Sequence, residues 1–340
     1  MPPIIDLHCD TLYRLASAPE RFFAPAGSHS SHIFYHGLRA ANSLLQCFAV
    51  FTDLCELPTA SPLSFLTEQL RCFQKILSLS EGQLMQIRTF ADLATCIRQG
   101  NIGALLTLEE SCLSEQPVTL LPELYSLGIR IATLTWDYSN LLATSAAEAL
   151  PVPYPHRFTF RSAFPKASES FSGLSPAGYA FLEEAERLGI LIDVSHLSDA
   201  GFRDVAAHSK RPFLATHSNS RSVCNVPRNL SDDMLRTLAN RGGLAGLCLH
   251  EPFLLSPSGS KNDLTEAIIA HVRHILSITG SEVLVLGTDF DGTSGNRSFP
   301  DISALPRLAD LLKKAGVTSG QIDRLFYKNA LRFFQENLPA

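Results

Sequence analysis

Residues 4–12 read IIDLHCDTL, an apolar run interrupted by ionisable side chains. If this run is a β-strand, its alternation places Asp6, His8 and Asp10 on one face and the apolar side chains on the other. Burying a carboxylate without a partner is very unfavourable, so such a row is normally paired, hydrogen-bonded or bound to a cation. The stretch therefore requires a partner from elsewhere in the chain.

Short apolar runs, many of them β-branched, recur along the whole sequence. The eight expected strands are residues 4–8, 44–52, 102–109, 129–136, 190–196, 212–218, 243–249 and 283–289. Amphipathic segments with helical spacing separate most of them, among these 176–189, 232–243, 264–280 and 306–316. Apolar strands that alternate with helices indicate a parallel sheet, and eight such units predict an α/β fold of the (β/α)8 TIM barrel type.

The chain of 340 residues fits one barrel domain, and neither an internal repeat nor a linker divides residues 1–340. Two irregular segments rich in Pro, Ser and aromatic residues, 18–36 and 143–175, are expected to be long βα loops. The second would cover the active site. An amphipathic tail, 324–340, predicts a closing helix.

Composition and charge argue against some classes of binding partner. A net charge of −5 with 45% hydrophobic and 18% charged residues argues against nucleic acid or an anionic membrane as partner. We find neither a secretory signal nor a run of about 18 apolar residues, so a cytoplasmic location is expected. The eight cysteines lack CxxC spacing and are expected to be reduced core thiols.

Metal-binding residue types stand at the ends of the expected strands, where a barrel gathers its catalytic groups. Imidazole and carboxylate are zinc ligands, and a catalytic zinc site keeps one position open for water. Five such ligands exceed the need of one zinc ion, so we expect two Zn2+ per chain, with a shared hydroxide between them. The expected ligands are His8 and Asp10 on one metal, His196 and His217 on the other, and Glu109 as the bridge.

The bridging carboxylate has a competitor in the adjacent Glu110. Only one of the two can point inward on a pleated strand. We favour Glu109 because it continues the parity of Leu105 and Thr107.

Asp289 ends the last expected strand, in the motif GTDFDG, and is the candidate general acid/base. Asp291 would share its face if the strand continued, but the glycine after it indicates that the strand ends. The other histidines with metal-like spacing are expected to be solvated or on the surface, whereas His250 is expected to line the pocket. The solvated set is His29, His32 and His36 in a loop, and the surface set is His271 and His274 on a helix.

At these residues the sequence resembles the membrane (renal) dipeptidase family of zinc peptidases, within the amidohydrolase-like barrels. The resemblance covers nearly the whole chain, and His196 and His217 keep a separation of 21 residues that is typical of the family. Its markers are IDLHCDTL (5–12), LTLEES (106–111), GLSPAGYAFLEEAERLGILIDVSHLS (173–198), ATHSNSRSVCNVPRNLSDDML (215–235) and GTDFDG (287–292).

The resemblance implies a dipeptidase with the zinc ligands given above, with Asp289 handling the proton. It also marks Arg228, in VPRNL, as the group that binds the free carboxylate of a dipeptide. An arginine fork suits a carboxylate because it donates two parallel hydrogen bonds. Relatives further suggest a homodimer, and Asp6, one pleat below the ligands, would support them by hydrogen bonding.

Two substitutions distinguish this chain from the renal members of the family. Trp136 stands where they have a histidine that stabilises the tetrahedral intermediate, so either the Trp136 indole N–H or Asn140 is the expected oxyanion donor. Phe253 stands where relatives present a substrate-contacting tyrosine. No lysine lies near the end of 129–136, which argues against barrels that bridge their metals with a carboxylated lysine.

The sequence thus predicts a zinc-dependent dipeptidase that attacks the peptide carbonyl with the shared hydroxide and tolerates D-residues at the C-terminal position. An alternative uses the same metals on another amide, such as a β-lactam, an N-acyl amino acid or a modified secondary-metabolite peptide. A third possibility is a metal-stabilised barrel that binds a partner without catalysis, although such a module has no need of Asp289.

Overall fold

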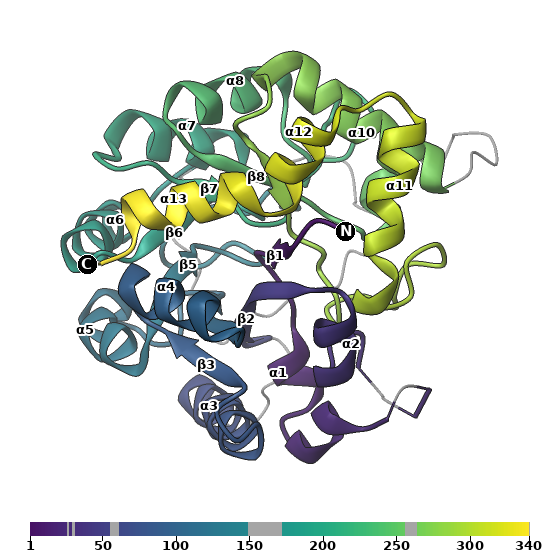
Figure 1. Ribbon diagram of the computed structural model, residues 1–340. Coiled ribbons are helices and arrows are strands. Elements are labelled where there is room, and N and C mark those ends of the chain that lie inside the picture. The colour runs from purple at the N-terminus through teal and green to yellow at the C-terminus, as the bar shows by residue number, and fades with distance from the viewer. Residues whose placement is uncertain (26, 29–30, 55–60, 149–171, 256–263, 340) are drawn as a thin grey trace.

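The computed structural model describes residues 1–25, 27–28, 31–54, 61–148, 172–255 and 264–339, in which nine parallel strands form one sheet. β2 pairs with both β1 and β4, and this pairing closes eight strands into a ring. The predicted (β/α)8 barrel is confirmed (Figure 1). The strands are β1 (Ile4–Asp6), β2 (Ser43–Phe51), β3 (Leu84–Ile87), β4 (Ile102–Glu109), β5 (Ile129–Thr133), β6 (Leu191–Asp193), β7 (Leu214–Ala215), β8 (Leu244–Leu247) and β9 (Leu284–Leu286).

The ninth strand, β3, is not part of the ring. It pairs with Ile102–Leu105 of β4, whereas β5 pairs with β4 only from Leu106 onward. The sequence did not predict β3, because its four residues include the half-buried Met85 and Gln86 and form no apolar run. Most other strands are shorter than predicted, since the polar residues at their ends leave the ladder of hydrogen bonds.

Helices surround the ring of strands (Figure 1). Several begin at a serine or threonine whose hydroxyl accepts a backbone N–H of the first turn, and four end at a glycine in the left-handed conformation. The α-helices are α1 (Thr11–Arg14), α2 (Tyr35–Ala40), α3 (Pro62–Leu79), α4 (Phe90–Gln99), α5 (Pro117–Leu127), α6 (Pro176–Leu188), α7 (Asp199–His208), α8 (Asp232–Asn240), α9 (Glu251–Leu254), α10 (Leu264–Thr279), α11 (Pro306–Lys314), α12 (Ser319–Asp323) and α13 (Asn329–Asn337). Pro19–Phe23 and Ile302–Ala304 form 3-10 turns, and Arg324–Lys328 forms a π-helical turn before α13.

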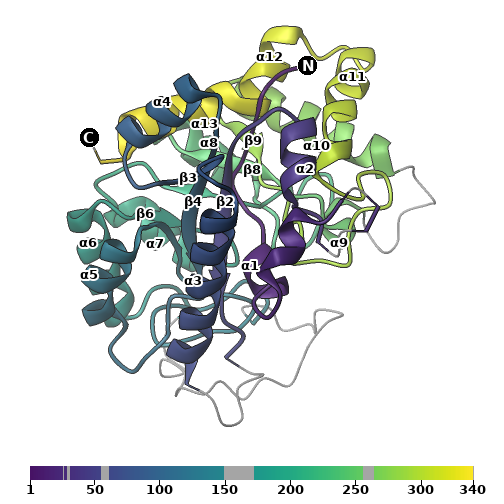
Figure 2. The ribbon, with the colours of Figure 1, turned by 60° about the horizontal axis from the view of Figure 1, so that its bottom comes forward.

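One inward apolar side chain from each ring strand fills the barrel below the site. These residues are Ile5, Leu45, Leu105, Ile131, Leu191, Leu214, Leu244 and Val285, and they form one cluster with Phe333 and Phe334 of α13. The predicted closing helix therefore seals one end of the barrel. Figure 2 places both termini and α13 at this end. The carboxyl ends of the strands, and the site, lie at the other.

Two of the expectations about histidines are wrong. His271 of α10 is fully buried: its Nδ1 accepts a hydrogen bond from the Ser220 N–H, and its Nε2 lies 3.2 Å from the Leu254 carbonyl oxygen. The surface prediction failed because α8 and α9 cover this part of α10. His32 is partly buried, and its Nδ1 accepts a hydrogen bond from the Asp291 N–H at 2.9 Å, whereas His36 is exposed as expected.

The two expected loops have different outcomes. Segment 18–36 contains the turn Pro19–Phe23 and ends as α2 begins. Residues 149–171 of the second loop, and with them its predicted role in covering the site, lie outside the described residues, as does His29. In the described parts of the chain, no helix combines the length and apolarity needed to cross a membrane. Seven cysteines are described, and all are buried and free of disulfides.

The burial of His271 predicts a specific pH dependence of stability. Burial lowers the pKa of His271 from 6.5 to about 4. In the unfolded chain His271 binds a proton below about pH 6.5, whereas in the folded chain it does so only below about pH 4. The free energy of unfolding therefore falls as the pH falls through this window, by roughly 3 kcal/mol at most. We expect His271→Gln to lose less stability between pH 6.5 and 4 than wild type does, as measured by urea unfolding.

His36→Gln, which removes an exposed histidine, serves as the control and should follow the wild-type profile. Parallel profiles for wild type and His271→Gln would contradict the role of His271.

Candidate metal centre

Six residues predicted from the sequence converge at the carboxyl ends of the strands. They follow β1, β6, β7 and β9 or end β4, and each is at most 8% exposed. They are His8, Asp10, Glu109, His196, His217 and Asp289. The ring closure brings together residues that are up to 281 positions apart in the sequence (289 − 8).

Glu109 occupies the centre of this group, with its two oxygens facing different neighbours. Oε2 lies 3.4 Å from His8 Nε2, and the same nitrogen lies 3.4 Å from Asp10 Oδ2. Oε1 lies 3.0 Å from His196 Nε2 and 3.6 Å from His217 Nε2. One carboxylate thus spans two sets of donors, as a bridging ligand does.

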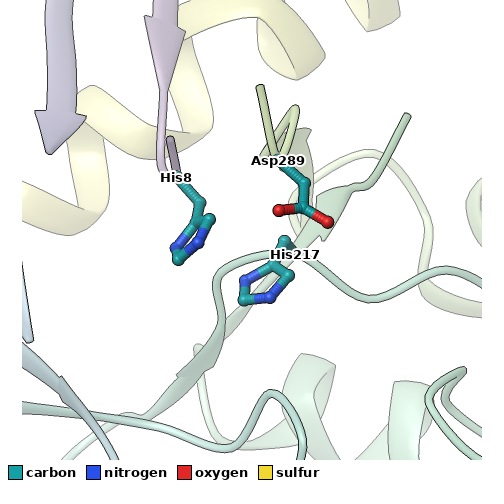
Figure 3. A group of neighbouring side chains, drawn as sticks. All are labelled: His8, His217 and Asp289. Carbon is teal, nitrogen blue, oxygen red and sulfur yellow. The ribbon is translucent and has the colours of Figure 1, made fainter. Parts of the chain in front are cut away.

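His8 and His217 lie against each other between the two sets. Their rings stack with centroids 3.9 Å apart, and His196 Nε2 is 3.0 Å from His217 Nε2. Asp289 completes a third group, in which ligand atoms of His8, His217 and Asp289 all lie within 4.8 Å of one another. Figure 3 shows these three side chains converging from separate segments.

The structure separates the adjacent Glu109 and Glu110 as predicted. Glu109 points into the cluster, whereas Glu110 is fully buried beside it and accepts hydrogen bonds from the Cys112 and Trp136 N–H groups and the Asn140 amide. Burial raises the pKa of Glu110 to about 7. Glu110 therefore supports the segment after β5 and does not face the donors.

Backbone conformation at the site is unusual for residues with a side chain. Glu110, His196 and Asp289 have φ values of 66°, 66° and 62°, in the left-handed region that non-glycine residues seldom occupy. Such strain persists where the surrounding structure enforces it, and it often marks functional sites. Here the chain turns sharply at or directly after a strand-end carboxylate or imidazole. Gly292 leaves room for this turn, since a Cβ there would lie 2.2 Å from Asp10 Oδ2.

Asp6 does not share a face with His8 and Asp10, contrary to the expectation. β1 ends at Asp6, whose neighbours Ile5 and Leu7 both point into the inner cluster. The carboxylate of Asp6 accepts hydrogen bonds from the Thr288 N–H and hydroxyl and from Gln46. Its predicted part as hydrogen-bonding support for the site holds, because Thr288 directly precedes Asp289.

Asp193, which the sequence analysis did not single out, supports the two later histidines in the same way. Oδ1 accepts from the Ser195 and Thr216 N–H groups, and Oδ2 accepts from the hydroxyls of Thr133 and Thr216. The Thr216 hydroxyl also lies 2.8 Å from His217 Nδ1, which leaves Nε2 directed at Glu109.

Asp137 is a second residue that the sequence analysis missed. Its Oδ1 lies 2.7 Å from His196 Nδ1 and 3.9 Å from Arg228 Nε. Although burial opposes ionisation, His196 and Arg228 hold the pKa of Asp137 below its ordinary value. Its position directly after Trp136, just beyond the end of a strand, was the available signal.

The cluster opens into a pocket of about 180 Å³ with acidic and aromatic walls. Trp136, Phe253 and His250 line it, as expected for them, and Tyr13 and Phe51 join the aromatic wall. A larger groove between α3 and α5 contains none of the clustered residues. The pocket is lined by Asp10, Tyr13, Phe51, Glu109, Trp136, Asp137, His196, His250, Phe253, Asp289, Asp291, Gly292 and Thr293.

Asn140 is not available to a substrate, and its predicted role as a substrate contact is corrected. It is fully buried: its amide donates to Glu110 and the Leu134 carbonyl and accepts from the Leu142 and Ala143 N–H groups. These bonds use its whole hydrogen-bonding capacity. Of the two proposed oxyanion donors, only Trp136 lines the pocket.

Arg228 is buried behind the pocket wall. Its guanidinium donates to the Ser218 hydroxyl and the His217 carbonyl and lies 5.1 Å from the centre of the Phe253 ring. Within the described part of the chain its Nε has no hydrogen-bond partner. Arg228 therefore retains a donor near the site, although it is not one of the residues that line the pocket.

Comparison with known proteins decides the family. The sequence profile of the membrane dipeptidase family, peptidase family M19, matches residues 1–338. The chain belongs to the M19 family. The resemblance inferred from the motifs is confirmed, and M19 membership makes the chain a hydrolase of the metallopeptidase class.

The curated relatives are matched over different shares of their own length. The chain is 28% identical over 272 residues to an uncharacterized protein in the pqqA 5' region of Klebsiella pneumoniae, covering 80% of this chain and 95% of that protein. It is 30% identical over 266 residues to dipeptidase verJ of Clonostachys rogersoniana, covering 78% of this chain and 63% of verJ. The match thus spans less than two thirds of the fungal protein.

Solved structures share this barrel fold. Dipeptidase AC, a metallopeptidase of family M19, superposes with a TM-score of 0.84 at 23% identity, over 100% of this chain and 99% of that one. A metallopeptidase from Rhodobacter sphaeroides, bound to a phosphinate mimic of the dipeptide L-Ala-D-Ala, has the same TM-score and identity over 99% of both chains. At this identity the likeness establishes the fold.

The donors fit the metal ions that the family implies. His8 Nε2 and Asp10 Oδ1 are buried without a hydrogen-bond partner among the described residues. Burial and the charge of Glu109 raise the pKa of Asp10 to about 7, while burial and His8 hold the pKa of His217 well below its usual value. In the metal-free chain, although burial opposes it, the nearby carboxylates raise the pKa values of His8 and His196. A cation would take the place of those protons, satisfy the orphaned atoms and offset the repulsion between the carboxylates.

The adjacent glutamates provide a direct test of this site. We expect Glu109→Gln to bind fewer zinc ions per chain than wild type at saturating zinc, because it loses the carboxylate that faces both donor sets. Glu110→Gln should keep the wild-type number, because that side chain faces away. Elemental analysis after removal of free metal measures the zinc content of both variants. Equal losses of zinc in the two variants would contradict the assignment of Glu109.

Proposed function

We propose that the chain is a zinc-dependent dipeptidase that holds two zinc ions. The observation that carries the proposal is the division of Glu109, whose Oε2 faces His8 and whose Oε1 faces His196 and His217. Asp10 would complete the first set of ligands. Three imidazoles and two carboxylates suit zinc, which accepts both nitrogen and oxygen ligands.

Bound zinc ions would supply Lewis-acid activation of a water molecule, as a shared hydroxide, and of the scissile carbonyl. The protein supplies the proton transfers. Asp289 lines the same pocket and lies beside the donor cluster, so its carboxylate can take the proton of the attacking water and deliver it to the leaving nitrogen. The Cys248 thiol, 3.5 Å from Asp289 Oδ2, and the hydrogen bond from the Asp289 N–H to the His8 carbonyl hold this residue in place.

The pocket favours a small peptide. Its volume of about 180 Å³ is below the roughly 300–1,000 Å³ of ordinary small-molecule sites, which suits two residues better than a longer chain. Phe51 and Trp136, with ring centres 5.0 Å apart, offer an apolar wall for a substrate side chain. The Trp136 indole N–H is the proposed donor to the oxyanion. Tolerance of D-residues at the C-terminal position is proposed from the L-Ala-D-Ala mimic bound by the Rhodobacter protein.

A second candidate is the same centre acting on another amide. The observation that favours it is the surroundings of Arg228, which lies behind the pocket wall with its Nε 3.9 Å from Asp137 Oδ1. A carboxylate already near this arginine would compete with the carboxylate of a dipeptide. A substrate without a free C-terminal carboxylate, such as a modified secondary-metabolite peptide whose C-terminus is blocked, would avoid the competition.

The first test combines metal analysis with a substrate panel. We expect close to two zinc ions per chain and hydrolysis of L,L- and L,D-dipeptides. Asp289→Asn should lower kcat by about 10²–10⁴-fold, the usual contribution of a general acid/base, while it retains zinc.

Zinc content and thermal stability of the Asp289 variant are measured in the same preparation, so that loss of metal is distinguished from loss of the proton carrier. Full dipeptide hydrolysis by a metal-free protein would contradict the proposal.

The second test addresses the substrate carboxylate. Replacing Arg228 with Met should raise KM for dipeptides by roughly 10–100-fold, which corresponds to one or two charge-assisted hydrogen bonds. Dipeptide amides, which lack the carboxylate, serve as matched substrates and should be little affected. Equal effects on both substrates would remove Arg228 from the binding role and favour the second candidate.

The homodimer and the cytoplasmic location expected from the sequence remain proposals. Sedimentation of the purified chain would determine the first, and fractionation of cells that produce it would determine the second.

A further inference from the structure

Asp137 makes a short contact with one ligand of the proposed metal site. Its Oδ1 is 2.7 Å from His196 Nδ1, while His196 Nε2, on the other side of the ring, is 3.0 Å from Glu109 Oε1. An imidazole that donates its Nδ1 proton to a carboxylate presents the lone pair of Nε2 to a metal. The contact therefore determines which nitrogen of His196 faces the donor cluster.

The two histidines of this donor set have different outer partners. His217 Nδ1 lies 2.8 Å from the hydroxyl of Thr216, which is neutral, whereas His196 Nδ1 faces a carboxylate. A charged acceptor makes a stronger hydrogen bond and raises the basicity of the imidazole. Of these two histidines, His196 is therefore the one held by a charged side chain.

The segment that carries Asp137 is held at three neighbouring positions. The Trp136 N–H donates to Glu110, and the Asn140 amide donates to the same carboxylate. Between them, the buried Tyr138 hydroxyl accepts from the Leu54 N–H at 2.8 Å and lies 3.3 Å from the Thr52 carbonyl oxygen. Asp137 is therefore presented to His196 from a fixed backbone.

Arg228 also lies close to Asp137. Its Nε is 3.9 Å from the Oδ1 that contacts His196, and this nitrogen has no hydrogen-bond partner among the described residues. The positive charge favours the ionised form of Asp137 without occupying it in a close hydrogen bond. The carboxylate is left free to accept from His196.

We propose that Asp137 is a positioning residue that holds His196 as a metal ligand. The proposal rests on the metal centre proposed above and adds a residue whose side chain contacts no metal. Because it acts through His196, its removal should weaken the binding of one zinc ion and leave the ion on the side of His8 and Asp10 nearly unchanged.

The experiment is an equilibrium zinc titration of the metal-free chain against a chromophoric chelator. We expect Asp137→Ala to lower the zinc affinity of one of the two sites by about 10–100-fold and to leave the other unchanged. This is the usual effect of losing a residue that hydrogen-bonds a metal ligand. Asp137→Asn keeps the shape and an acceptor oxygen, so its loss should be smaller. Cobalt substitution gives a second readout, since a reoriented His196 would change the visible absorption bands of that ion.

Asp232→Asn is the matched control. Asp232 Oδ1 also lies 2.7 Å from a histidine, His274 Nε2, but neither residue lines the pocket or belongs to the donor cluster. The control removes the same charge from the same kind of pair, and its zinc affinities should equal those of wild type.

Three results would overturn the role of Asp137. Wild-type affinities for both ions in the two Asp137 variants would exclude it. Equal weakening of both ions, with a lower melting temperature of the metal-free variants, would indicate general damage to the fold. A wild-type chain that binds no zinc would overturn the metal centre itself. This result differs from wild-type affinities in the Asp137 variants, because in that case the wild-type chain binds both ions. If Asp137→Ala fails to fold, the nearly isosteric Asp137→Asn decides.

Discussion

The rest of the site depends on the contacts between the buried carboxylate of Glu109 and the three imidazoles around it. β4 ends at Glu109 and places its side chain among the donors, where its two oxygens face different histidines. The next residue, Glu110, takes a left-handed conformation and turns its own carboxylate away. The two adjacent acidic residues therefore have different roles: Glu109 faces the donor cluster, and Glu110 accepts hydrogen bonds from the segment after β5.

Buried carboxylates hold the strand ends in register around this centre. Asp6 joins β1 to the turn after β9, and Asp193 joins β6 to β5 and to the residues after β7. Asp291 accepts from the Thr11 hydroxyl and from the His32 and Ile33 N–H groups, which fixes the first helix and the following loop. Each accepts at least one backbone N–H, so the energetic cost of burying its charge is offset by hydrogen bonds that also position the ligands.

The parts of this arrangement that repeat along the chain were predictable from sequence. Apolar runs that end in His, Asp or Glu indicated the barrel and its donors, because a parallel barrel presents all such ends on one rim. Alternation along β4 also separated Glu109 from Glu110. Alternation failed at Asp6, where β1 stops two residues before the first ligand. It gave no information on Asp137, Asp193 or Asn140, whose roles depend on hydrogen bonds between segments that no periodic pattern records. His271 was misjudged because α8 and α9 cover its helix, and this packing is not recorded in the spacing of apolar residues.

The closed ring also has a consequence for the order of folding. The inner cluster joins Ile5 of β1 to Phe333 and Phe334 of α13, and the Thr11 hydroxyl bonds to Asp291, 280 residues away. Contacts over such separations form late, because the entropy of closing a long loop must be overcome before they contribute. By this argument we expect the donors near the two ends of the chain, at residues 8 and 289, to join those at 109, 196 and 217 late in folding. A correctly formed metal environment would therefore be a signature that the whole barrel has closed.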